Sequence, residues 1–219
     1  MERLIAIGDI HGCYNTFVEL MKKLEYSSKH DTIVFLGDYI DRGPYSYQVV
    51  STIRKLQVQV GSDKVICLRG NHEQFAITRN GSLDLLWKRN GGAATVYDYE
   101  RNGFDIAEHI AWFRSLPLVY DTPEIIFSHA GLTYPLLKDN SADDLLWGRD
   151  WIDTDDDPRE KQVIFGHTPR NTFKPYQTAS GDICIDCGCV FGGSLCAIVL
   201  RDDGTSDFVA VKKSNHDFQ

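Results

Sequence analysis

Short apolar runs, each followed at once by a polar cluster that contains glycine, recur five times along this 219-residue chain. A short apolar run bounded in this way is typical of a buried strand. In an α/β sheet, ligands gather beyond the carboxyl ends of the strands, so the clusters are expected to meet at one edge, where their glycines allow tight turns. The clusters are residues 8–12 (GDIHG), 37–43 (GDYIDRG), 70–73 (GNHE), 128–131 (SHAG) and 166–168 (GHT).

The first part of the chain alternates between strand and helix patterns. Residues 3–8 predict a buried strand, and apolar residues recur at helical spacing over residues 17–24. Further strands are predicted at residues 32–37 and 64–68, with a helix over residues 47–57 between them. This alternation implies an α/β fold with parallel strands joined by βαβ crossovers.

The second half of the chain has a different pattern. Residues 81–117 predict a more polar helical region in which Trp87, Trp112 and Phe113 pack inward. Short strands then return, and the last two form a hairpin that turns at residues 202–204. The expected strands are residues 118–120, 124–128, 162–165, 182–186, 194–200 and 206–211.

Length and composition favour one globular domain covering residues 1–219, with 42% hydrophobic and 25% charged residues. The apolar start is too short for a signal peptide, and no segment reaches the roughly eighteen apolar residues of a membrane helix. A cytoplasmic protein without membrane contact is therefore expected. The formal net charge of −8 argues against nonspecific nucleic-acid binding. It does not exclude phosphate substrates, because bound divalent cations can reverse the local field.

Two other clusters offer alternative metal sites. The six cysteines are expected to be reduced, since no secretory signal accompanies them. Three of them, Cys184, Cys187 and Cys189, could form a zinc clip, but no second half of such a site follows, so packing is favoured. Cys13 is also assigned to packing. The acidic residues 153–158 lack the spacing of a calcium loop and predict a solvated surface loop.

The five glycine-containing clusters carry the residue types of a metal site. A single histidine at a strand end is more often structural than a ligand, but five polar clusters together favour metal binding. Aspartate, histidine and asparagine supply the mixed oxygen and nitrogen ligands that suit manganese, iron or zinc. Two adjacent metal ions can activate a shared water and neutralise charge on phosphate oxygens. The pattern therefore favours a metal site, at which two ions would suit phosphate chemistry.

The motifs GDIHG, GDYIDRG, LRGNHE, SHAG and GHT, in this order, resemble those of the calcineurin-like metallophosphoesterases. Within that group the chain is similar to the phosphoprotein phosphatases, in particular the small bacterial serine/threonine protein phosphatases. The resemblance runs from about Leu4 to Leu200 and is sharp at the motifs. It implies a four-layer α/β fold with a central β-sandwich flanked by helices, which goes beyond what periodicity indicates.

The resemblance also implies roles for individual residues. Asp38 would bridge two metal ions, and His72 would be a general acid that Asp41 holds protonated and oriented. Arg42 resembles a phosphate-clamping arginine, and Arg149 resembles a second one. The implied ligands are Asp9 and His11 on one ion, Asp38 on both, and Asn71, His129 and His167 on the other, with Asn71 also bordering the substrate.

Several assignments have structural alternatives. His72 could instead brace its loop through a hydrogen bond, and Arg149 could form a surface salt bridge. Arg69 and Glu73 are expected to brace their motif without touching substrate. Three histidines match no motif and are expected at the surface: His30, His109 and His216.

The implied reaction is hydrolysis of phosphoserine and phosphothreonine monoesters by in-line attack of a metal-bridging hydroxide. Manganese is the favoured metal, with iron or zinc as alternatives, and the substrate would be a phosphoprotein or a small phosphate ester. No equivalent of the active-site tyrosine near the C-terminus of large eukaryotic members can be placed in this sequence, so no regulatory subunit is implied. One alternative is a diadenosine tetraphosphate hydrolase, which shares a segment similar to residues 186–195. Another is a non-catalytic metal-binding scaffold, which the intact ligand set disfavours.

Overall fold

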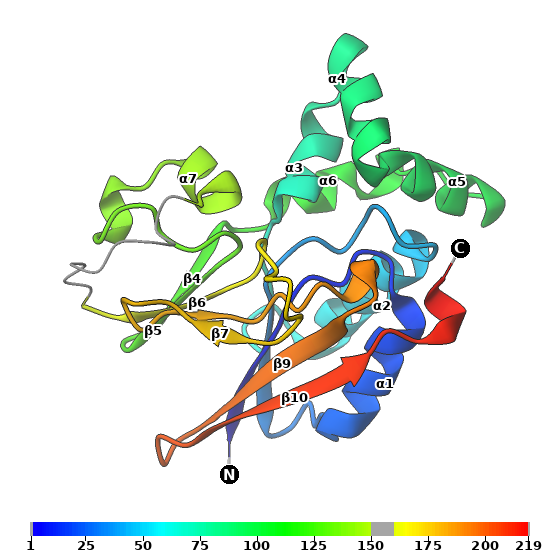
Figure 1. The fold of residues 1–219 in the computed structure, drawn as a ribbon. Coiled ribbons are helices and arrows are strands. Elements are labelled where there is room, and N and C mark those ends of the chain that lie inside the picture. The colour runs from blue at the N-terminus through cyan, green and yellow to red at the C-terminus, as the bar shows by residue number, and fades with distance from the viewer. Residues whose placement is uncertain (1, 150–159, 219) are drawn as a thin grey trace.

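Two five-stranded sheets form the centre of the structure (Figure 1). The computed structural model describes residues 2–149 and 160–218. The strands of the first sheet are β1 (Arg3–Ile7), β2 (Asp31–Phe35), β3 (Val65–Cys67), β9 (Ser194–Arg201) and β10 (Ser206–Lys212). Their order is β10–β9–β1–β2–β3. The parallel strands β1, β2 and β3 therefore lie beside an antiparallel hairpin, as predicted.

The second sheet combines strands from the later half of the chain. Its strands are β4 (Val119–Asp121), β5 (Ile125–Ser128), β6 (Gln162–Phe165), β7 (Tyr176–Gln177) and β8 (Ile183–Cys184). Their order is β4–β5–β6–β8–β7, and β5, β6 and β8 are parallel. Each sheet thus contributes three parallel strands whose carboxyl ends can carry functional loops.

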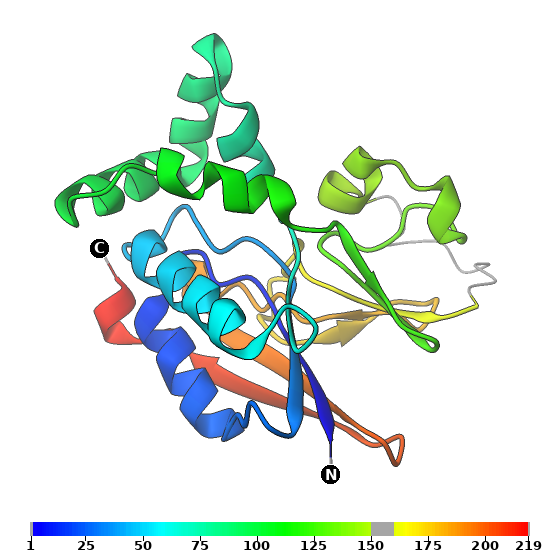
Figure 2. The ribbon, with the colours of Figure 1, turned by 180° about the vertical axis from the view of Figure 1, so that it is seen from behind.

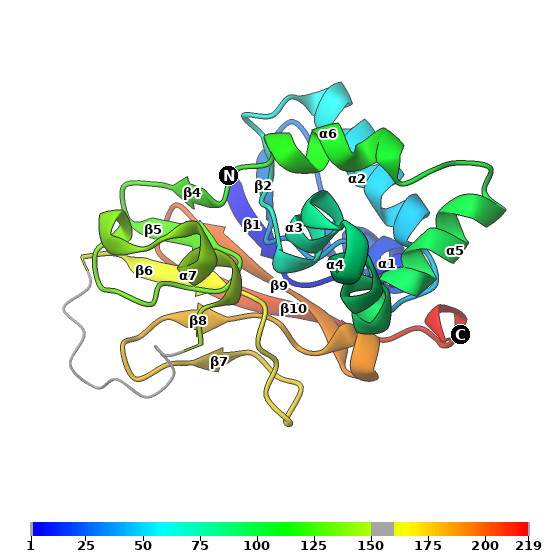
Figure 3. The same ribbon diagram turned by 90° about the horizontal axis from the view of Figure 1, so that it is seen from above.

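Helices surround the two sheets (Figure 1). They are α1 (Tyr14–Leu24), α2 (Ser46–Val60), α3 (Asn71–Thr78), α4 (Gly81–Trp87), the π-helical η1 (Lys88–Gly92), α5 (Ala93–Arg101), α6 (Ala107–Ser115) and α7 (Ala142–Trp147), with 3₁₀ turns η2 (Leu137–Asp139), η4 (Cys189–Phe191) and η5 (Asn215–Asp217). Figure 2 shows α1 and α2 against the first sheet, and Figure 3 shows α7 over the second. The α4 helix projects away from the body of the protein (Figure 1). No helix among the described residues is long and apolar enough to cross a membrane.

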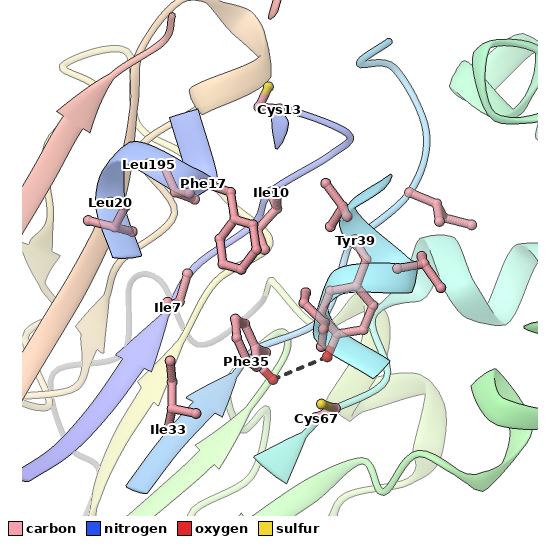
Figure 4. Close-up of a cluster of buried hydrophobic side chains, with 14 of the residues drawn as sticks. Ile7, Ile10, Cys13, Phe17, Leu20, Ile33, Phe35, Tyr39, Cys67 and Leu195 are labelled. Carbon is pink, nitrogen blue, oxygen red and sulfur yellow. Dashed lines mark hydrogen bonds between the residues drawn. The ribbon is translucent and has the colours of Figure 1, made fainter. Parts of the chain in front are cut away.

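Alternation of side chains along the strands creates the layers. Ile5 and Ile7 belong to the buried cluster that includes Phe17 of α1, shown in Figure 4. Ala6, between them, belongs to a second cluster that includes Phe127 of β5. Successive side chains of a strand point to opposite faces, so β1 is apolar on both sides and buried on both. The predicted α/β sandwich flanked by helices is therefore confirmed.

Two details differ from the sequence expectations. Strand β7 was not predicted, because two residues are too few to show a periodicity. The surface assignment of His109 is wrong, since it is only 6% exposed. His109 lies one helical turn before Phe113 on the inner face of α6, where its Nδ1 pairs with the Tyr99 hydroxyl at 2.9 Å. Burial lowers the pKa of His109 to about 4.

Other expectations agree with the structure, and one concerns residues outside the described ranges. Residues 81–117 are largely helical, and Trp87 and Phe113 are fully buried. His30 and His216 are exposed. The six cysteines are all buried free thiols, which fits the packing role. The acidic residues 153–158 fall outside the described residues.

The start of α1 depends on a residue near the other end of the chain. The residue before α1, Cys13, makes no side-chain capping bond. Instead the buried carboxylate of Asp217 accepts the backbone N–H groups of Asn15 at 3.0 Å and Thr16 at 2.7 Å. These are two of the N–H groups that a helix leaves unpaired in its first turn, and the negative charge also suits the helix dipole. Asp217 therefore acts as a remote cap that joins η5 to α1.

We expect Asp217→Ala to lower the free energy of unfolding by about 2–3 kcal/mol, because buried N–H donors lose a charged acceptor. Urea denaturation of parent and variant would measure the change. Asp202→Ala, in the exposed hairpin turn, is the control and should change stability by less than about 0.5 kcal/mol. An equally small effect of Asp217→Ala would contradict the capping role.

Candidate metal centre

Six loops that follow the carboxyl ends of the parallel strands meet at one edge of the sandwich. The loops come from β1, β2 and β3 of the first sheet and from β5, β6 and β8 of the second. Nine polar residues on these loops are each at most 8% exposed. They are Asp9 and His11, Asp38 and Asp41, Asn71 and His72, His129, His167 and Asp186. Such a concentration of buried polar groups requires dense mutual pairing or a bound ion.

The backbone of these loops adopts unusual conformations. Among the described residues, seven that are not glycine have a positive φ, and five of them lie here: His11, Asp38, Asp41, Arg42 and His167. A positive φ costs a residue with a Cβ about 1–3 kcal/mol, and it persists only when surrounding contacts fix it. Strain of this kind concentrates at functional sites.

Close packing of two loops against carboxylates helps to fix these backbone conformations. A Cβ added to Gly166 would overlap Asp9 Oδ1, and one added to Gly70 would overlap Asp38 Oδ1. Only glycine allows the two loops to approach the carboxylates this closely. Both glycines therefore help to set the positions of Asp9 and Asp38.

A second contact joins the β2 loop to the β3 loop. The buried carboxylate of Glu73 accepts four backbone N–H groups: those of Asp38 at 2.8 Å, Tyr39 at 2.9 Å, Ile40 at 3.3 Å and Gly70 at 3.0 Å. The predicted bracing role of Glu73 is confirmed by these bonds. The guanidinium of Arg69 likewise bonds backbone carbonyls near the end of α6.

Asp38 lies between two groups of histidines. Its Oδ2 is 3.3 Å from His11 Nε2, and its Oδ1 is 3.4 Å from His129 Nε2. Potential ligand atoms fall into one cluster of His11, Asp38 and His72, and another of Asp38, His129 and His167. One carboxylate oxygen thus faces each side, which is the arrangement a metal-bridging carboxylate needs.

Backbone carbonyls orient two of the histidines. Nδ1–H of His11 donates to the Ile40 carbonyl at 2.7 Å, and Nδ1–H of His129 donates to the Leu36 carbonyl at 2.9 Å. Each Nε2 therefore carries a lone pair on the side of Asp38, as in metal-ligating histidines. Burial lowers the pKa of His11 to about 4 and that of His167 to about 2, so both rings are neutral at pH 7.

The amide of Asn71 faces a ring of acceptors. Its Oδ1 lies 2.9 Å from His129 Nε2 and 3.2 Å from His167 Nδ1, and both Asp38 oxygens are 3.2 Å away. An amide oxygen and these acceptors repel one another unless a cation lies among them. Without an ion, the amide would turn to present its NH₂ group. This donor set therefore fits a divalent metal ion.

Two further buried carboxylates, those of Asp9 and Asp186, add negative charge to the site. Burial, together with Asp186 and Asp38, raises the pKa of Asp9 well above its usual value. Burial likewise raises the pKa of Asp186 to about 7. Asp9 also accepts the backbone N–H of His167 at 3.1 Å. Neighbouring buried carboxylates favour binding of a cation, because the cation offsets both the burial and their mutual repulsion.

His72 and Asp41 form a buried pair in which Nδ1 of His72 lies 2.6 Å from Asp41 Oδ2. The same Asp41 oxygen accepts the indole N–H of Trp87 at 2.8 Å, and Oδ1 accepts the Thr95 hydroxyl at 2.7 Å. Burial acts to lower the pKa of His72, but Asp38 and the bond from Asp41 outweigh it and raise the pKa above its ordinary value. These contacts favour the protonated form of the imidazole.

A small polar cavity of about 130 Å³ opens beside these residues. It is lined by Asp38, Arg42, Asn71, His72, Phe75, Asn90, Trp147, Arg149 and His167. Both predicted arginines thus reach one pocket. Arg42 Nη1 lies 2.5 Å from His11 Nε2, and Nε of Arg149 donates to His167 Nε2 at 3.3 Å. Two guanidinium groups around a cavity of this size suit a tetrahedral oxyanion.

Residues 2–208 match the family model described as calcineurin-like phosphoesterase. The chain belongs to the calcineurin-like phosphoesterase family. It is 29% identical to an asymmetrical bis(5'-nucleosyl)-tetraphosphatase PrpE of Anoxybacillus flavithermus, covering 88% of each chain. It is 28% identical to serine/threonine-protein phosphatase 1 of Salmonella typhimurium, covering 87% of this chain and 88% of the relative.

Solved structures share the fold of this phosphoesterase. One is a protein serine/threonine phosphatase from Saccharomyces cerevisiae, with a TM-score of 0.70, 18% identity, and coverage of 98% of this chain and 81% of that one. The family uses a dinuclear metal centre, and the two ligand clusters that share Asp38 are the candidate groups for it here.

Sequence reasoning missed several residues of this phosphoesterase site. Asp186 follows the apolar run that ends at Ile185 and stands two residues before Gly188, so the rule that identified the five clusters would also have found it. Trp87 was assigned to packing alone, and Thr95 was not singled out. Both belong to a polar helical region without a motif, so only the fold reveals that they bond Asp41. Asn90 in the pocket had no sequence signal either.

We expect Trp87→Phe to lower kcat of the phosphoesterase about threefold to tenfold on alkyl phosphates, because Asp41 loses a donor that fixes it beside His72. The ring is largely retained, so folding should persist. Trp112→Phe is the matched control, since its indole donates to Gln57 at 3.1 Å and not to the site. Equal kcat values for the two variants would show that the Trp87 bond does not support the pair.

Proposed function

We propose that this phosphoesterase hydrolyses phosphate monoesters, with phosphoserine and phosphothreonine as substrates and with two divalent metal ions, manganese above all, as cofactors. The observation that carries the proposal is the buried pair of His72 and Asp41, in which Asp41 accepts further bonds from Trp87 and Thr95. The alkoxide of serine or threonine is a poor leaving group that needs a proton in the transition state. A protonated and firmly oriented imidazole supplies that proton.

The residues present fit the two ions. We propose Asp9 and His11 as ligands of one ion, Asn71, His129 and His167 as ligands of the other, and Asp38 as the bridge. When bound, the ions would supply the chemistry of a water activated at neutral pH and would offset charge on the phosphoryl oxygens. Asp9 falls outside the two tight ligand clusters, but its carboxylate bonds to the backbone of His167.

The chain's own groups have separate tasks in this proposal. Arg42 and Arg149 bind the phosphoryl oxygens in the cavity, where paired guanidinium bonds fix its orientation. Asp41 holds His72 through Nδ1, so the proton to be given to the leaving oxygen is carried by Nε2. The small volume of the cavity admits one phosphoryl group and leaves the rest of the substrate outside.

We expect His72→Asn to lower kcat/KM on a phosphoserine peptide at least about tenfold more than on p-nitrophenyl phosphate, because p-nitrophenolate leaves without a proton. Both substrates would be assayed with manganese supplied. His30→Asn, at an exposed site, serves as the control and should leave both rates unchanged. Equal losses on the two substrates would instead favour the alternative in which His72 braces its loop.

A second candidate function is hydrolysis of a dinucleoside polyphosphate, which the tetraphosphatase relative favours. A structural observation also supports it. A cavity of about 440 Å³ is lined by Pro44, Tyr45, Ala94, Tyr97, Arg101 and Phe218. Pro44 lies two residues beyond Arg42, which lines the phosphate pocket, so one loop contributes to both cavities. The Arg101 guanidinium lies 5.1 Å from the ring centre of Tyr45 and 5.8 Å from that of Tyr97. Such aromatic surfaces are suited to stacking a nucleobase.

A direct comparison separates the two candidates. We expect kcat/KM for a phosphothreonine peptide to exceed that for diadenosine tetraphosphate under the same metal conditions. Tyr97→Ala should change both values by less than about threefold, since Tyr97 is two-thirds exposed and remote from the ligands. A preference of tenfold or more for the dinucleotide, about 1.4 kcal/mol, that is lost in Tyr97→Ala would establish the second function instead.

A further inference from the structure

The kinked segment η1 brings an additional polar residue to the phosphate pocket. It joins α4 to α5, and Asn90 is its central residue. Asn90 lines the same cavity as Arg42 and His72. The segment is not a regular helical turn, because Gly91 has non-helical backbone angles and forms a kink between α4 and α5. The backbone conformation of η1 therefore affects which side chains the pocket presents to a ligand.

Contacts with the catalytic loops hold η1 in place. Gly91, directly after Asn90, has a φ of 111°, and its carbonyl accepts the Arg42 N–H at 3.1 Å. A Cβ on Gly91 would lie only 2.7 Å from the Arg42 nitrogen, so the two backbones are in direct contact. Gly92 packs against the ring of Trp87, whose indole bonds Asp41. The position of Asn90 is therefore fixed relative to Arg42 and to the acid pair.

The chemistry of the pocket indicates what Asn90 binds. Within residues 2–149 and 160–218, no hydrogen-bond partner of the Asn90 amide is found, although Asn90 borders a polar cavity. Two arginines line the same cavity, so its ligand is anionic and presents several acceptor oxygens. An amide NH₂ adds a neutral donor that binds one such oxygen without adding charge.

We propose that Asn90 is a substrate-binding residue whose Nδ2 donates a hydrogen bond to a non-bridging oxygen of the phosphoryl group. This inference rests on the proposed function only in requiring that the pocket receives a phosphoryl group. It does not depend on whether the leaving group is an amino-acid side chain or a nucleotide. The bond orients the phosphoryl group together with Arg42, and it comes from a segment outside the strand loops that carry the metal ligands.

Manganese-loaded Asn90→Ala tests the proposal through two readouts. We expect kcat/KM to fall about tenfold or more on both p-nitrophenyl phosphate and a phosphoserine peptide, because the donor acts on the group that the substrates share. Inorganic phosphate binding, measured by calorimetry, should weaken by a similar factor. Asn90→Asp should be worse in both readouts, since a carboxylate repels the phosphoryl oxygens. Asn80→Ala, at the other end of α4 and without a capping bond, is the matched control and should be unchanged.

Specific outcomes overturn the inference. If kcat/KM and phosphate affinity of Asn90→Ala both stay within threefold of the parent, Asn90 does not bond the phosphoryl group. A loss confined to one leaving group would place Asn90 against that group and not against the phosphoryl oxygens. A lower Tm with unchanged phosphate affinity would make Asn90 a structural residue. If the parent binds phosphate but hydrolyses neither ester, and Asn90→Ala still weakens phosphate binding, the proposed function fails while the Asn90 contact stands.

Discussion

The buried carboxylate of Glu73 is the interaction on which the candidate centre depends. Its bonds to the N–H groups of Asp38, Tyr39 and Ile40 hold the β2 loop, and its bond to Gly70 holds the β3 loop. Because one side chain serves both loops, neither can shift without leaving buried donors unpaired. This constraint fixes the Asp38 carboxylate between the two histidine groups, and the sheets supply the remaining ligands from fixed strand ends.

Much of this arrangement could be predicted from the sequence. Apolar runs followed by Asp9, Asp38, Asn71, His129 and His167 indicated where strands end, and parallel strands bring such ends together. The order of the motifs pointed to the family, and through it to the sandwich, which strand periodicity alone did not indicate. Local signals were sufficient wherever a functional residue directly follows a strand.

The remaining contributions come from tertiary structure and left no local pattern. Trp87 and Thr95 lie in a helical region without a motif, and they reach Asp41 only because α4 and α5 pack over the β2 loop. His109 gave no signal of burial, because a histidine on a helix face is compatible with either environment. Asp217 caps a helix about two hundred residues away, a pairing that sequence spacing does not reveal.

The glycines of the ligand loops also bear on how this site can diversify. With no space for a Cβ at Gly70 or Gly166, most substitutions there would displace Asp38 or Asp9, so these loops tolerate little variation. The α4–η1 segment projects from the body and borders the pocket from outside the ligand shell. New substrate preferences can therefore evolve, or be engineered, by varying the length and residues of this segment while the hydrolytic centre stays intact. We therefore expect relatives that share these ligand loops to act on different substrates.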